Sequence, residues 1–138
     1  MEIEHLIFSE GPQRVAPFSH AVRAGEYLFI TGQMPTLKHD NTKLVKGGIE
    51  EQTLQVMNNL IDVLNRAGSL LEKVIFARVY LVNFQDFDRM NEVYSSFQVR
   101  QAARQNMYWG YWTCGWFISR NRLCCSGLEI IFVKTLAD

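Results

Sequence analysis

Residues 48–68, GIEEQTLQVMNNLIDVLNRAG, decide the fold because they form the clearest helical pattern in this chain of 138 residues. Inward-facing side chains recur there at intervals of three and four, and polar ones mostly lie between them. The inward set is Ile49, Thr53, Val56, Leu60, Val63 and Leu64. Gly68 predicts the end of the helix, since glycine readily adopts the left-handed conformation that closes many helices.

Strand patterns lie on both sides of this helix. Residues 18–34 predict a strand, a turn at residues 24–26 and a second strand rich in β-formers. Residues 5–8 predict a short edge strand, and residues 35–46 read as a polar loop. After the helix, residues 73–82 predict a strand whose near-continuous apolarity indicates burial on both faces. Residues 84–97 predict a second helix, and a further strand is expected after it. This order indicates an α+β domain over residues 1–138, with its helices on one face of a sheet.

Composition excludes several classes of protein. The formal net charge is zero and no long like-charged run occurs, so nucleic acid is not an expected partner. The acidic N-terminal residues are not a signal peptide, and no window approaches the roughly 18 apolar residues of a membrane span. The three cysteines, Cys114, Cys124 and Cys125, lack the spacing of a zinc site or a disulfide framework. We therefore expect a cytoplasmic protein without a bound metal.

The first two-thirds of the chain resemble the RidA/YjgF family, also called the YER057c family. The resemblance spans residues 1 to about 97 and rests on several motifs that occur in family order and spacing. They are APFSHAV at 16–22, LFITGQMP at 28–35, GIEEQT at 48–53, VYLVNFQDF at 79–87 and MNEVY at 90–94.

This resemblance implies a chorismate-mutase-like α+β fold, which is a mixed sheet with two helices packed on one face. It also implies a homotrimer with clefts between its subunits. The implied activity is hydrolysis of reactive enamine and imine intermediates, of the 2-aminoacrylate type, to 2-keto acids and ammonia. No cofactor is implied, and the implied partner is a small imino acid.

Four positions match residues that line the family's cleft. Thr31 matches a Ser/Thr position, with Gly32 beside it, although a hydroxyl at a strand end can equally bond the local backbone. Phe18 stands where many active members carry Tyr, which removes a hydroxyl and favours packing. Asn91 matches a residue of the second helix that faces the cleft, and the alternative is an Asn on the helix surface.

His5, His20 and His39 have no metal-ligand spacing and are expected on the surface or in loops.

The last third of the chain departs from the family pattern. No acidic residue occurs between Glu92 and Glu129, yet all three tryptophans and all three cysteines fall there. The family supplies a carboxylate-binding Arg from a Pro-Ala-Arg-Thr/Ser-Cys motif after the second helix, and a Glu from the closing strand. Neither motif is intact. Arg104 and Glu129 are the nearest matches, the alternatives being a solvated arginine and a coincidental glutamate.

The genetic code indicates a cause for this departure. Met and Trp each have one codon, so reading one base later turns Met107-Tyr108 into Cys. The same shift gives a Gly codon at Trp109-Gly110, at Trp112-Thr113 and at Trp116-Phe117. The permitted codons then allow Leu-Pro-Ala-Arg-Thr-Cys, which continues the family pattern. We predict a single-base slip near residues 97 to 104, and codons under residues 103–107 that cannot spell Ala-Arg-Thr-Cys one base later would contradict it.

Three functions stay open at this point. The first is the imine and enamine deaminase, with weak or absent activity in the chain as written because the motif arginine is missing. The second is a non-enzymatic homotrimer that binds a small molecule or a protein. The third, an endoribonuclease or translation inhibitor, has only older family labels behind it, and no basic groove or catalytic His pair is visible. The tryptophan-rich segment could also be a base-stacking platform, but a shifted frame or a buried strand explains it better.

Overall fold

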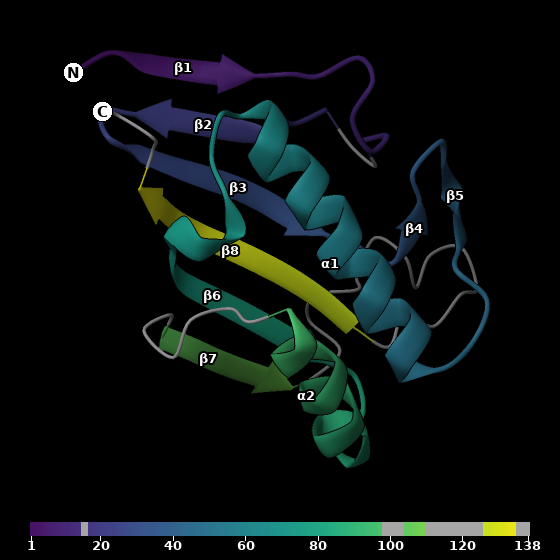
Figure 1. Ribbon diagram of the computed structural model, residues 1–138. Coiled ribbons are helices and arrows are strands. Elements are labelled where there is room, and N and C mark those ends of the chain that lie inside the picture. The colour runs from purple at the N-terminus through teal and green to yellow at the C-terminus, as the bar shows by residue number, and fades with distance from the viewer. Residues whose placement is uncertain (15–16, 98–103, 110–125, 135–138) are drawn as a thin grey trace.

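The computed structural model describes residues 1–14, 17–97, 104–109 and 126–134. Within these ranges six strands form one sheet in the order β1-β2-β3-β8-β6-β7 (Figure 1). Their bounds are Ile3–Leu6 (β1), Ala21–Ala24 (β2), Tyr27–Gln33 (β3), Val74–Leu81 (β6), Arg104–Trp109 (β7) and Ser126–Lys134 (β8). β6 and β7 are parallel, and the other neighbours are antiparallel. The sheet is therefore mixed, as expected.

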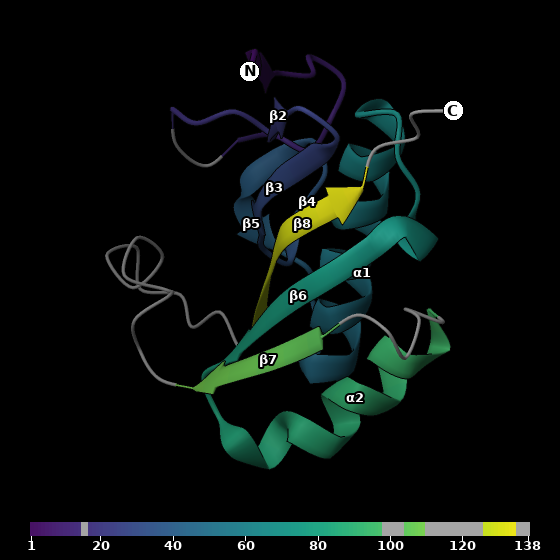
Figure 2. The same cartoon turned by 90° about the vertical axis from the view of Figure 1, so that its left-hand side faces the viewer.

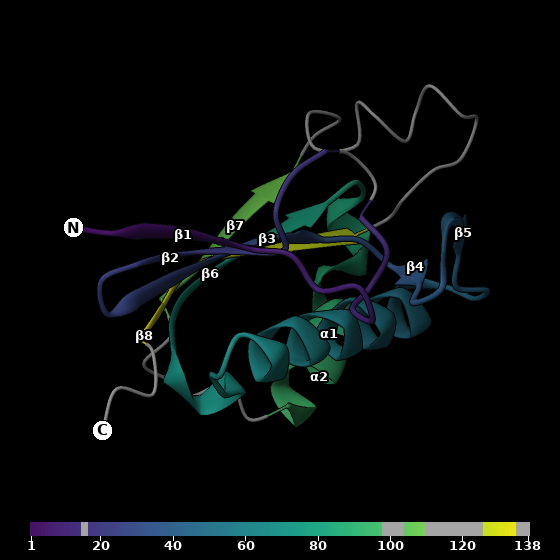
Figure 3. The same ribbon diagram turned by 90° about the horizontal axis from the view of Figure 1, so that it is seen from above.

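Two helices cover one face of this sheet, α1 at Ile49–Arg66 and α2 at Phe87–Ser96 (Figure 3). Short 3₁₀ turns at Leu71–Lys73 (η1) and Phe84–Asp86 (η2) precede β6 and α2. The expected α+β architecture is confirmed, and the second helix begins three residues later than the pattern predicted.

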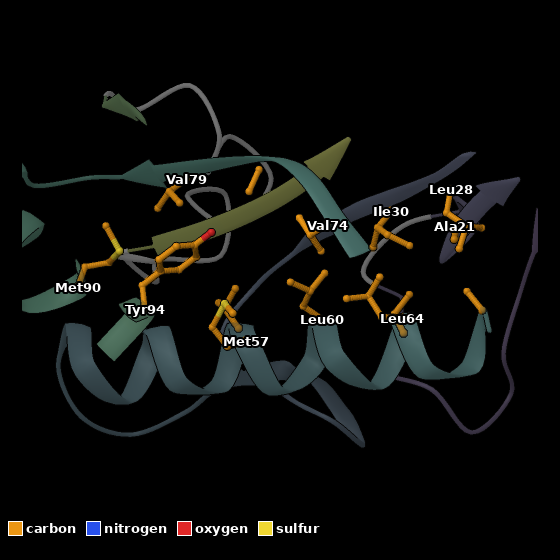
Figure 4. Packing of buried hydrophobic residues seen from close by; sticks show 14 of the residues in the cluster. Ala21, Leu28, Ile30, Met57, Leu60, Leu64, Val74, Val79, Met90 and Tyr94 are labelled. Atoms are coloured by element: carbon orange, nitrogen blue, oxygen red, sulfur yellow. The ribbon is translucent and has the colours of Figure 1, made fainter. Parts of the chain in front are cut away.

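The hydrophobic core lies between α1 and the sheet. Leu28 and Ile30 of β3 and Leu60 and Leu64 of α1 are nearly inaccessible to solvent and point toward one another (Figure 4). Alternate residues of β3 point to opposite faces of the sheet. Phe29 and Thr31 therefore lie on the face that the helices leave uncovered, and they are half-buried.

Glycines fix two turns as the sequence predicted. Gly68 has a φ of 76°, and its N–H donates to the Asn65 carbonyl at 3.1 Å, which closes α1. Gly25 has a φ of 58° in the turn between β2 and β3. Residues with a Cβ rarely adopt this left-handed backbone, so the two glycines set where the helix and the strand end.

The interpretation of residues 35–46 as a loop was wrong in part. Thr36–Leu37 (β4) and Asp40–Leu44 (β5) form a small antiparallel hairpin beside α1. Asp40 stabilises its turn, since its Oδ1 accepts from the Thr42 N–H at 3.0 Å. The sequence pattern missed the hairpin because Asp, Asn and Lys are poor β-formers.

Within the single chain, residues 73–82 are buried on one face only, so the expected burial on both faces is not met there. In β6 Ala77, Val79 and Leu81 are buried, whereas Phe76 and Tyr80 are half-buried and Ile75 is 46% exposed. The apolar residues that do not reach the helices lie on the opposite face of the sheet. β6 therefore carries apolar residues on both faces, but only the face toward the helices is fully buried.

The tail as written supplies two strands of the sheet. β8 lies between β3 and β6 and pairs with both, while β7 forms the edge beyond β6 (Figure 2). A sheet without β8 would expose two strand edges inside the molecule. The written tail therefore completes the sheet, whatever its origin.

An ion pair joins the two helices at their exposed surface. Arg89 of α2 donates through Nε and Nη2 to the two carboxylate oxygens of Glu50 in α1, each at 2.7 Å. This hydrogen bonding lowers the pKa of Glu50 below its ordinary value. The pair links α2 to the N-terminal turn of α1.

Candidate functional site

A shallow hollow opens at the C-terminal end of β3. Three chain segments line it: the loop after β1, the residues that lead into β2, and the passage from β3 into β4. The lining residues are Pro12, Gln13, Arg14, Phe18, His20, Thr31, Gly32, Gln33, Met34 and Thr36. A more open hollow borders the same loop on the β1 side.

His20 anchors the loop that forms one wall of this site. Its Nε2 donates to the Pro12 carbonyl at 2.7 Å, and its Nδ1 accepts from the Phe8 N–H at 3.1 Å. These partners fix the neutral tautomer with the proton on Nε2. His20 lies in the loop before β2, one of the two expected places, but it is only 5% exposed and so is not a surface residue. Because both ring nitrogens are engaged, His20 acts as a structural residue.

The floor of the site is the end of β3. The Thr31 hydroxyl donates to the Ser19 carbonyl at 2.6 Å, and the Thr31 N–H donates to the His20 carbonyl at 3.1 Å. Gln33 folds back, and its Nε2 donates to the Thr31 carbonyl at 2.7 Å. The hydroxyl proton of Thr31 therefore serves the backbone, which leaves the oxygen as a hydrogen-bond acceptor toward the hollow.

Asn59 of α1 holds the passage from β3 into β4. Its Nδ2 donates to the carbonyls of Met34 and Thr36 at 3.1 and 2.9 Å, and its Oδ1 accepts from Gln55 Nε2 at 3.0 Å. The side chain is 3% exposed. A buried amide with all three bonds made fixes the backbone that forms this wall of the hollow.

The structure brings three of the predicted site residues together. Phe18, Thr31 and Gly32 all line the same hollow, and Phe18 is 36% exposed. Asn91 lies on α2 and is not among the residues that line either hollow. What each residue binds stays a prediction.

Strand register places the backbones of the other two predicted residues. Glu129 lies between Leu128, which pairs with Gln33, and Ile130, which pairs with Ile30. Its backbone is therefore beside Thr31 and Gly32. Arg104 pairs with Phe76 on the edge strand β7, and β8 and β6 separate that strand from β3. Cys114, Cys124 and Cys125, with Trp112 and Trp116, lie outside the described residues.

Sequence reasoning missed four residues of the site: Arg14, His20, Gln33 and Asn59. Arg14 gave no signal, since it stands in an irregular loop. Asn59 is one of the polar residues between the inward-facing positions of α1, and only the packing of β4 on this helix reveals its partners. His20 was inside a quoted motif, but its two backbone partners are 8 and 12 residues away.

Metal-binding clusters and membrane-spanning helices are both absent from the described part of the chain. No group of three or more His, Cys, Asp or Glu side chains there could hold a metal ion. No described helix combines the length and apolarity needed to cross a membrane.

Comparison with known proteins gives consistent matches. A family model described as Endoribonuclease L-PSP matches residues 8–107. A RutC family protein from Pyrococcus horikoshii is 42% identical over 96 residues, which is 69% of this chain and 75% of that protein. One from Saccharolobus solfataricus is 40% identical over the same length and the same shares.

Solved structures match over nearly the whole chain. One from Thermotoga maritima is 29% identical with a TM-score of 0.81, and covers 97% of this chain and 98% of that one. RidA from an Antarctic Psychrobacter shares the fold at 22% identity and a TM-score of 0.79, with 94% and 98% covered. Together with the matching family model, these relatives establish that the chain belongs to the RidA/YjgF family, also described as Endoribonuclease L-PSP.

Proposed function

We propose that this protein hydrolyses reactive enamine and imine intermediates of the 2-aminoacrylate type to 2-keto acids and ammonia. Family membership supports the reaction class. The observation that carries the proposal to this chain is that Phe18, Thr31 and Gly32 line one hollow.

The hollow suits a small planar substrate. The Phe18 ring offers an apolar wall, and the Thr31 oxygen can accept a hydrogen bond from an imine N–H or from the attacking water. Gly32 is exposed and has no side chain, so a ligand can approach the backbone there closely. Holding water and the C=N carbon in a fixed geometry is the contribution expected of such a site.

We expect the chain as written to be a weak catalyst because the family's motif arginine is missing from its sequence. The test couples a serine or threonine dehydratase to keto-acid release, with and without the 138-residue chain. A matched chain carries, after about residue 97, the tail that the shifted frame permits. Restoring the motif should raise the rate at least about tenfold, since the motif arginine adds a charge-assisted, two-bond contact to the substrate carboxylate.

Two outcomes would contradict these expectations. Equal and full activity in both chains would mean that the written tail retains a competent site. Activity in neither chain would overturn the proposed reaction, provided that both chains give the same circular dichroism.

A second candidate function is binding of a small molecule without catalysis. One observation favours it: the described lining residues include no carboxylate, thiol, lysine or tyrosine. Their titratable side chains are Arg14 and His20, and both ring nitrogens of His20 are engaged. Saturable binding of a keto acid with no acceleration of imine hydrolysis by either tail would select this function.

We also propose that the chain assembles as a homotrimer, in the cytoplasm, through the sheet face that the helices leave uncovered. Half-buried Phe29, Phe76 and Tyr80 lie on this face, with Arg78 over the Phe76 ring at 5.6 Å. Aromatic and Arg side chains are enriched in interface cores. Light scattering should give about three times the 16.0 kDa chain mass, and a stable monomer at micromolar concentration would contradict this proposal.

Imaging of the tagged chain in its own cell would test the proposed location in the cytoplasm.

A further inference from the structure

Arg14 lies at the mouth of the hollow and is held from both ends. Its Nη1 donates to the Phe18 carbonyl at 3.0 Å, and its own carbonyl accepts from Asn41 Nδ2 at 2.5 Å. The neighbouring Gln13 N–H donates to the Lys38 carbonyl at 3.0 Å. The hairpin β4–β5 therefore fixes the backbone of the loop, and Phe18 fixes the direction of the guanidinium.

The guanidinium has most of its hydrogen-bonding capacity left. Among the described residues it makes one hydrogen bond and no ion pair, although a guanidinium carries five N–H donors. Two other donors of the hollow are already used, since the Thr31 hydroxyl donates to the Ser19 carbonyl and Gln33 Nε2 donates to the Thr31 carbonyl. Arg14 is thus the main source of unused hydrogen-bond donors among the described lining residues. It is also the one among them whose side chain is permanently charged.

We propose that Arg14 binds the carboxylate of the ligand in this hollow, in a chain whose tail lacks the family's motif arginine. This inference rests on the proposed function for its ligand class, a small 2-oxo or 2-imino acid. The Arg14 guanidinium is a single positive charge with no described carboxylate beside it, so it matches a ligand with a single negative charge. A planar guanidinium also matches the two oxygens of a carboxylate, whereas a phosphate dianion would call for further cations.

The orientation of the ligand follows from this assignment. With the carboxylate at Arg14, the carbon chain lies along the Phe18 ring, and the oxo or imino group points toward Thr31 and Gly32. Arg14 is therefore a binding residue that touches the carboxylate, while Thr31 and Gly32 lie nearest to the reacting carbon.

The test uses the full ¹⁵N-labelled chain titrated with sodium 2-oxobutyrate, with 2-butanone as the neutral analogue of similar size. 2-Oxobutyrate should shift the amide signals of Thr31 and Gly32, and 2-butanone should shift them only at far higher concentration. Arg14→Gln should weaken 2-oxobutyrate binding at least about tenfold, and Arg14→Lys should weaken it less because the charge remains.

The matched control is Lys46→Gln, which makes the same charge change at an exposed position that does not line the hollow. It should leave the affinity within about twofold. The amide signals of Phe8 and His20 report whether the loop keeps its structure in the Arg14 variants. Unchanged signals together with lost affinity would assign the effect to the ligand contact.

The outcomes separate this inference from the proposed function. Equal affinity in Arg14→Gln and the parent, or no binding of 2-oxobutyrate at millimolar concentration, would overturn the role of Arg14. Binding that depends on Arg14 without any imine hydrolysis would keep this role and remove the proposed reaction. Hydrolysis that is unaffected by Arg14→Gln would keep the reaction and remove the role.

Discussion

Asn59→Leu should lower the free energy of unfolding by about 2 kcal/mol, since it removes a donor from one buried and one half-buried backbone carbonyl. Asn59 donates to the carbonyls of Met34 and Thr36, and its 3% exposure excludes replacement by bulk water. The loss should also loosen the wall of the hollow that these residues form. Urea unfolding at constant pH measures the first effect, and exchange of the Val45 amide, which donates to Pro35, measures the second.

Asn58→Leu is the matched control, because the next residue toward the N-terminus of the same helix is exposed. It makes the same change of side chain and should alter the free energy of unfolding by no more than about 0.5 kcal/mol. Similar losses at the two positions would mean that Asn59 is not the anchor of this segment.

Raising the pH from about 10 to about 12 should cost the folded protein on the order of 2 kcal/mol through Tyr94 alone. Burial in the core beside Met57 and Met90 raises the pKa of Tyr94 to about 12, from the ordinary value of 10.0 (Figure 4). The folded state holds the neutral phenol, whereas the unfolded chain ionises it above pH 10. The contribution of Tyr94 to the free energy of unfolding is therefore fully present below pH 10. It disappears as the pH rises through the folded-state pKa.

Tyr94→Phe removes the ionising group and should flatten this part of the profile of unfolding free energy against pH. Tyr27→Phe, at a position that is 44% exposed, is the matched control and should leave the profile as in the parent. Denaturant unfolding at several pH values between 8 and 12 measures all three chains. The same slope in Tyr94→Phe as in the parent would contradict the assignment to Tyr94.

The elements that the sequence predicted correctly are those whose signals are local. The register of α1 follows from its apolar spacing, and its end follows from Gly68. Phe18, Thr31 and Gly32 come from short motifs, and the structure places all three on one hollow, while their role stays a prediction. The hairpin β4–β5 was missed because its residues are polar and its stability comes from packing against α1.

The sequence alone determined the family, the α+β class, the two helices and the turn at Gly25, since short-range periodicity and backbone preferences specify each of them. Tertiary structure decided the strand order, in which β8 enters between β3 and β6, and it decided which side chains meet in the hollow. Arg14 reaches the carbonyl of Phe18, and Asn59 holds residues 34–36, which lie more than 20 residues before it. Such contacts depend on how separate elements pack, and no local pattern in the chain records that packing.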